Sequence, residues 1–135
     1  MAKLFRSREG AVTAVDTKTQ LTTLGSETAP GPMLVPAGAT KIKAIICAMS
    51  ADLATAADGT HFIRLEGSGL PEGPESFVIG ASGVPVATGG SYANPAFRFE
   101  VDIPVTPSNE ILIFGENAGE DSGSATYGVT LEFES

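Results

Sequence analysis

The sequence predicts an all-β protein, a two-sheet antiparallel sandwich with a jelly roll of about eight strands as the expected architecture. Three observations predict it. Apolar and polar residues alternate with a period of two in several segments, turn residues separate these segments, and helical periodicity is almost absent. The chain has 135 residues with 16 glycines and 9 prolines, and its 42% hydrophobic content indicates a folded core.

The first segment is expected to be an arm. Residues 1–32 read as an extended N-terminal arm with possible short strands at 11–15 and 20–24, because residues 25–36 show no alternation and contain three prolines. Residues 33–135 are expected to form the β-sandwich domain. Such an arm buries little of itself, so deletion of residues 2–24 should leave the melting of the sandwich nearly unchanged.

Three strands are expected in the middle of the chain. Residues 41–49 alternate at first and then become apolar on both faces, which is typical of the central strand of a sheet. Residues 50–58 have helix-forming composition and are interpreted as a loop or one short helix. Residues 61–65 form a strand with Phe62 and Arg64 on one face, residues 75–82 form another, and 84–88 is a weaker candidate.

The last third carries the clearest strand signals. In residues 97–105 and 127–133 the apolar side chains fall on one face and the polar ones on the other. Pro104 lies near the end of the first of these strands, which indicates an edge position. Between them, residues 111–114 are a continuous apolar run, so this strand is expected to be covered on both faces.

Charge is divided unevenly along the chain. The first 43 residues hold six Lys and Arg against three acids, whereas the remaining residues hold two against thirteen. The acidic body would repel phosphates, so direct nucleic-acid binding by it is not expected. No apolar run is long enough to span a membrane and the first ten residues lack the core of a signal peptide. No membrane association is therefore expected.

Groups for catalysis are few. His61 is the single histidine, and we expect it at a strand edge, partly exposed and without catalytic partners. Cys47 is the single cysteine and is expected in the core. We therefore predict that the protein is not an enzyme and uses no cofactor.

Two loops leave binding alternatives open. Glu116, Glu120 and Asp121 lie in a glycine-rich loop that could supply oxygen ligands to calcium, although a solvated acidic hairpin loop is the simpler interpretation. Tyr92, in the segment GGSYANP, is either a contact residue or a tether packed on the sandwich. On these features the chain could instead be a small carbohydrate- or calcium-binding module, for example in a tail or spike.

The segments VPAGATKIKAI, FRFEVDIPV and YGVTLEFES resemble, over residues 33–135, the small jelly-roll structural proteins of viruses and bacteriophages. The resemblance implies a capsid decoration or minor capsid subunit of the virion, made in the host cytoplasm and bound to the major capsid protein or other shell subunits. It also implies a homo-oligomer, with a trimer favoured. The expected partner-binding residues are Lys3, Leu4, Phe5, Arg6 and Arg8 of the arm, together with Tyr92.

Overall fold

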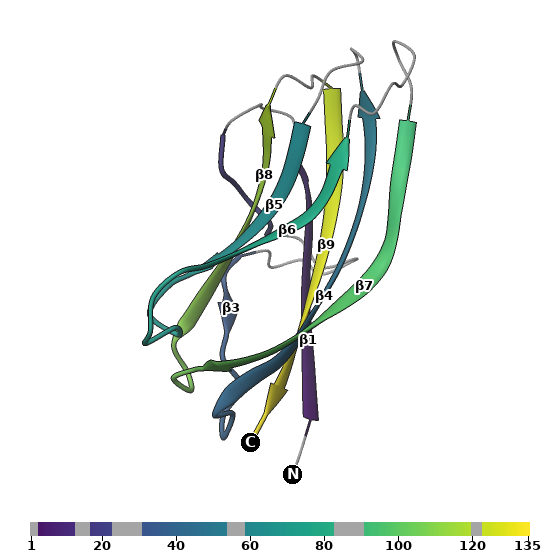
Figure 1. The fold of residues 1–135 in the computed structure, drawn as a ribbon. Helices are drawn as coiled ribbons and strands as arrows, with labels where there is room; N and C mark the ends of the chain where they lie inside the picture. Colours follow the sequence, from purple (N-terminus) through teal and green to yellow (C-terminus); the bar gives the residue numbers. More distant parts are fainter. Residues whose placement is uncertain (1–2, 13–16, 23–30, 54–58, 83–90, 120–122) are drawn as a thin grey trace.

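The computed structural model describes residues 3–12, 17–22, 31–53, 59–82, 91–119 and 123–135. These residues form nine strands and no helix, in two antiparallel sheets that enclose the core (Figure 1), which confirms the all-β sandwich. The strands are β1 (Lys3–Val12), β2 (Thr19–Gln20), β3 (Met33–Leu34), β4 (Lys41–Leu53), β5 (Gly59–Glu66), β6 (Glu75–Ser82), β7 (Ser91–Pro104), β8 (Glu110–Gly119) and β9 (Gly123–Glu134).

The strand order is that of a jelly roll. The first sheet has the order β1-β9-β4-β7 and the second β2-β8-β5-β6, while the short β3 pairs separately with β8. The antiparallel pairs are nested: β1 pairs with β9, β2 with β8, β4 with β7 and β5 with β6. The chain therefore resembles one long hairpin that is wound on itself, so that its two ends meet where Lys3 pairs with Glu134.

The core lies between the sheets and is filled by alternate residues of the strands. In β9, every second side chain from Tyr127 to Phe133 is at most 1% exposed, which confirms the alternation of this segment. In β7, Ile103 is buried, as is Val105 just after the strand, while Arg98 lies on the exposed face, again as predicted. Burying one such large apolar side chain contributes about 1.5–3 kcal/mol to folding.

β4 is the central strand that the sequence predicts, but it is longer than expected. It pairs with β7 on one side and β9 on the other and extends to Leu53. The prediction of a loop or helix from residue 50 is therefore wrong for residues 50–53. The backbone of Ala51 is matched with Tyr92 on one side and Ala125 on the other. Pairing on both sides overrides the weak helix propensity of this segment. Residues 54–58 lie outside the described part of the chain.

The N-terminal segment differs from an extended arm. Residues 3–12 form β1, which pairs with β9 from Lys3 to Val12, and both Val12 and Leu21 are 1% exposed in the core. Deleting residues 2–24 would therefore remove an edge strand and two core side chains. Residues 13–16 and 23–30 lie outside the described part, and the division of the chain at residue 33 stays a prediction.

β8 is covered on one face only, where the sequence predicted two. Ile111 and Ile113 are buried in the core, whereas Leu112 and Phe114 are half-buried on the outer face. The physical reason is that the second sheet has the first sheet on one side and solvent on the other. The continuous apolar run therefore places hydrophobic side chains on an outer surface.

Candidate partner-binding surface

β1 is an open edge of the first sheet. β9 pairs with one side of β1, and among the described residues no strand pairs with the other side. An unpaired edge presents a row of N–H and C=O groups that another chain can extend. β1 therefore offers backbone hydrogen bonds to a partner.

Hydrophobic and basic side chains stand on this edge. Leu4 is 37% exposed and Phe5 is 50% exposed, and Lys3 and Arg6 are exposed beside them. Successive residues of a strand point to opposite faces, so the two apolar side chains flank the edge on both sides. The structure thus brings four of the expected partner-binding residues together on one strand.

Arg8 forms hydrogen bonds within the chain, and its partner-binding role stays a prediction. Its Nε donates to the carbonyl oxygen of Gly31 at 2.9 Å, and its Nη2 donates to that of Pro32 at 3.3 Å. The guanidinium therefore ties β1 to the segment that leads into β3. These donors are therefore already used within the chain.

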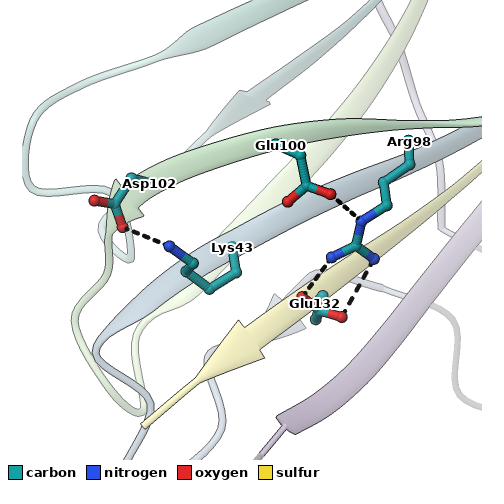
Figure 2. Close-up of polar contacts among 5 residues, drawn as sticks. All are labelled: Lys43, Arg98, Glu100, Asp102 and Glu132. Atoms are coloured by element: carbon teal, nitrogen blue, oxygen red, sulfur yellow. Dashed lines mark hydrogen bonds and ion pairs between the residues drawn. The ribbon is translucent and has the colours of Figure 1, made fainter.

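A lattice of ion pairs covers the outer face of the same sheet next to Phe5 (Figure 2). Arg98 of β7 reaches across β4 to Glu132 of β9, with Nη2 2.9 Å from Oε2 and Nη1 3.3 Å from Oε1. Its Nε also donates to Glu100. The strand between them carries the small side chain of Ala44 at this position, opposite both carboxylates, which leaves room for the guanidinium to cross.

Glu132 is the buried member of this lattice. Its side chain is 4% exposed, and the hydrogen bond from Arg98 lowers its pKa. The same bond, with the one to Glu100, raises the pKa of Arg98. A buried carboxylate is tolerated when a paired and hydrogen-bonded cation accompanies it.

The lattice continues toward the end of β7. The Nζ atoms of Lys41 and Lys43 each lie 3.5 Å from Oδ1 of Asp102, and the two positive charges lower the pKa of Asp102. The charges of this face are therefore largely matched by one another. The result is a polar surface beside a hydrophobic edge, the combination of core and rim that protein interfaces use.

A shallow hollow lies on the same face. It has a volume of about 190 Å³ and is lined in part by Glu9, Ile46, Ala48 and Thr130. Gly128 forms its floor, and a side chain added there would meet nothing within 4 Å. The hollow exists because small residues of β4 and β9 meet at this point.

The single histidine lies inside the sandwich, so its expected place at a partly exposed strand edge is wrong. His61 is 0% exposed, and its Nδ1 lies 2.5 Å from the hydroxyl oxygen of Tyr127. The tyrosine hydroxyl also lies 3.1 Å from the carbonyl oxygen of Glu116, so it bonds to both groups, and the imidazole tautomer sets the donor in the bond to His61. Burial lowers the pKa of His61 to about 4.

The remaining expected residues divide between core and undescribed positions. Cys47 is 0% exposed in the core, as predicted, and burial raises its pKa to about 12. Tyr92 lies in β7 and not in a loop, and the structure describes only its backbone.

The calcium alternative stays a prediction. Glu120 and Asp121 lie outside the described part of the chain, whereas Glu116 lies in β8 and not in a loop. Within the described ranges, no three His, Cys, Asp or Glu side chains gather to hold a metal ion. No helix in the same ranges is long and apolar enough to cross a membrane.

The sequence reasoning missed one site, on the outer face of the second sheet. A cavity of about 190 Å³ lies there, lined by Lys18, Phe62, Arg64, Ser76, Phe114 and Glu116. The signal for it was present: Phe62 shares a face with Arg64, and Phe114 alternates with Ile111 and Ile113. What hid the site was the expectation that β8 is buried on both faces.

Comparisons with known proteins find distant likenesses to solved structures. No protein family and no curated protein matches the chain. Among solved structures, a chain of the disulfide-linked pili that are Bacillus endospore appendages is 13% identical, with a TM-score of 0.38, 97% of this chain covered and 87% of that one. A xylan-binding module is 10% identical, with a TM-score of 0.47 and coverages of 96% and 97%.

A viral chain is among the similar structures as well. The BFDV capsid protein is 10% identical, with a TM-score of 0.28 and coverages of 99% and 98%. At such identities and TM-scores the likeness is one of general pattern, shared by pilus, capsid and carbohydrate-binding chains. It assigns no function to this chain, and the β-sandwich rests on the strand pairing described above.

Proposed function

We propose that this chain is a structural subunit that acts by surface contact and assembles through the open edge of β1. The observation that carries the proposal is the exposure of Leu4 and Phe5, 37% and 50%, on an edge with which no described strand pairs. Soluble monomers usually protect such edges, because they invite pairing with another chain. Burial of both side chains against a partner would add hydrophobic stabilisation to the backbone hydrogen bonds.

Complementary charges would orient the contact between two subunits. Lys3 and Arg6 stand beside the two apolar side chains, while the chain after residue 43 has thirteen acids against two bases. The basic edge of one copy is therefore complementary to the acidic body of another copy or of a different acidic subunit. Complementary charges speed association and orient it more than they tighten it.

Within this proposal, the assembly is a viral shell and the chain is a capsid decoration or minor capsid subunit. It would be made in the host cytoplasm, bind the major capsid protein or other shell subunits, and form a homotrimer. A trimer has no two-fold axis, so β1 of one copy would contact a different surface of the next copy. The support for this role is the jelly-roll strand order together with the open hydrophobic edge.

Light scattering coupled to gel filtration tests the assembly. We expect the purified full chain to give a mass near three times 13.8 kDa at high protein concentration. The double substitution Leu4→Lys and Phe5→Lys should reduce it to a single chain, because added positive charge at an edge opposes strand pairing.

Val78→Lys is the matched control, since Val78 is 53% exposed but lies on β6, an end strand of the second sheet. This variant should keep the mass of the wild-type protein, and thermal melting should show that all variants are folded. A wild-type protein that stays a single chain at every concentration overturns the proposal. So does an oligomer that survives the double substitution.

A further inference from the structure

The outer face of the second sheet carries an ordered array of aromatic and charged side chains. Phe62 of β5 lies opposite Val78 of β6 and Glu116 of β8, and the next outward residue, Arg64, lies opposite Ser76 and Phe114. Aromatic and polar groups thus alternate both along and across the strands. The cavity of about 190 Å³ lies among them.

The aromatic rings form the apolar part of this cavity. Phe62 and Phe114 are both half-buried, although they stand on the solvent side of the sheet. The ammonium of Lys18 sits 4.3 Å from the centroid of the Phe114 ring, a cation–π contact that holds the ring in place. Val78 lies beside these rings but outside the lining of the cavity, and it is 53% exposed.

The charges around the cavity balance one another. Lys18 Nζ lies 2.6 Å from a carboxylate oxygen of Glu66, and Arg64 Nη1 lies 4.0 Å from the same oxygen. With Glu116 added, the four charged side chains around the cavity sum to zero. An uncharged ligand is therefore favoured over an anion such as a phosphate or carboxylate.

Hydrogen-bonding groups remain for a ligand. Arg64 Nε donates to Ser76 Oγ at 3.2 Å, and this bond positions the guanidinium group. Its terminal nitrogens are the donors that it offers to a ligand. Within the described residues the Glu116 carboxylate makes no hydrogen bond or ion pair. A donor group and an acceptor group thus flank an apolar floor.

We propose that this cavity binds a single neutral sugar ring, a hexopyranose. Such a ring has an apolar C–H face that packs on Phe62 or Phe114, and hydroxyl groups at its edge that accept from Arg64 and donate to Glu116. The cavity is smaller than the roughly 300–1,000 Å³ of sites for drug-sized ligands, so it fits one ring and not a chain of them. This activity goes beyond assembly through β1 and does not depend on it.

An apolar side chain of another protein fits the same cavity less well. It would cover Arg64 and Glu116 without meeting their hydrogen-bonding groups, and a polar group buried without a partner is unfavourable. A free nucleobase would stack on the rings, but the phosphates of a nucleic acid would face an acidic body. The balance of apolar floor and uncommitted polar groups favours the sugar.

Titrations of the full-length protein observed by ¹H–¹⁵N NMR test the proposal. The probes are the methyl glycosides of glucose, galactose and mannose at up to about 50 mM, since one stacked ring gives weak binding. We expect at least one of them to shift the amide signals of Phe62, Arg64, Ser76 and Phe114 in a saturable way. N-acetyl-phenylalanine amide serves as the probe for an apolar side chain.

Two variants locate the binding. Glu116→Gln keeps the shape of the side chain but removes its charge, and Phe114→Ala removes a ring; each should weaken the binding about fivefold or more. The control is Val78→Thr, which lies beside the cavity but does not line it and should bind as the wild type does. Spectra without sugar show whether each variant is folded.

The outcomes are decisive in both directions. Saturable shifts confined to these residues, reduced by Glu116→Gln, support the proposal. The absence of shifts with all three glycosides overturns it, and so does a response to N-acetyl-phenylalanine amide alone. The oligomeric mass of the protein is measured separately, so failure here leaves the assembly through β1 untouched.

Discussion

Tyr127 links the two sheets by hydrogen bonds. Its ring belongs to β9 of the first sheet, whereas its hydroxyl bonds to His61 of β5 and to the backbone of Glu116 in β8. Both partners lie in the second sheet. A buried hydroxyl needs such partners, because an unpaired one would destabilise the core.

Gly115 makes room for this tyrosine, and the substitution Gly115→Ala should destabilise the fold. A Cβ at Gly115 would overlap the Tyr127 ring and come within 2.9 Å of Val12 Cγ2. Overpacking of a core generally costs about 1–3 kcal/mol, and we expect at least about 3 kcal/mol here because the ring is fixed at its hydroxyl. Urea unfolding measures the loss.

Gly128→Ala is the matched control. Gly128 lies next to Tyr127 in β9, and its added Cβ would meet nothing within 4 Å. The free energy of unfolding should change by less than about 1 kcal/mol, with a gain as the favoured sign, because alanine has less backbone entropy to lose than glycine. Equal losses for both variants would contradict the packing argument.

His61 should make the stability depend on pH. The imidazole has an ordinary pKa of 6.5 when unfolded and about 4 in the fold. Between these values the unfolded chain binds more protons, so stability rises with pH. The contribution is complete above pH 6.5 and is lost as the pH falls to 4.

The expected loss between pH 7 and pH 5 is about 2 kcal/mol, measured by urea unfolding. Glu132 and Asp102 have lowered pKa values, so they lose their contribution mainly below this range. His61→Gln removes the single histidine and should flatten the profile between pH 7 and pH 5. A slope that persists in this variant would show that another group is responsible.

At the scale of the element, β1 combines two tasks. Its inner residue Val12 is 1% exposed in the core, whereas Leu4 and Phe5 near its start are open to solvent. Its C-terminal half is therefore integrated into the sandwich, and its N-terminal half is available to a partner. Ser7 joins the two halves to β9 through a hydrogen bond of 2.7 Å to Thr130.

Removing residues 1–12 should therefore destabilise the sandwich. The deletion takes away the pairing with β9 and the buried side chain of Val12, and we expect a loss of about 3 kcal/mol or more in the free energy of unfolding. Phe5→Lys alone should change it by less than about 1 kcal/mol, because this side chain is 50% exposed. An unchanged melting temperature after the deletion would instead support the extended arm that the sequence predicted.

At the scale of the whole molecule, the nested strand pairs determine where the surfaces lie. β1 and β9 come from opposite ends of the chain, yet they meet at one edge of the first sheet (Figure 1). The second sheet turns its outer face, with Phe62 and Phe114, away from the ion-pair lattice of the first. The proposed assembly edge and the proposed sugar site therefore occupy different sheets, and one can be filled without covering the other.

The alternation of apolar and polar residues by itself determined the fold class and the inward residues of β7 and β9, and the apolar run around Cys47 placed that residue in the core. These properties depend on neighbours in the chain, because a strand places successive side chains on opposite faces. The residues of the partner-binding edge were also visible as an apolar and basic cluster, Lys3 to Arg6.

Only the tertiary structure decided that residues 3–12 form a strand and that β8 has an outer face. It also decided that His61 is buried and that Phe62 and Phe114 share a cavity with Arg64 and Glu116. Each of these outcomes depends on which distant strand becomes the neighbour, β9 for β1 and β8 for β5. Local periodicity carries no information about that choice, because long-range pairing is selected by the packing of the whole sandwich.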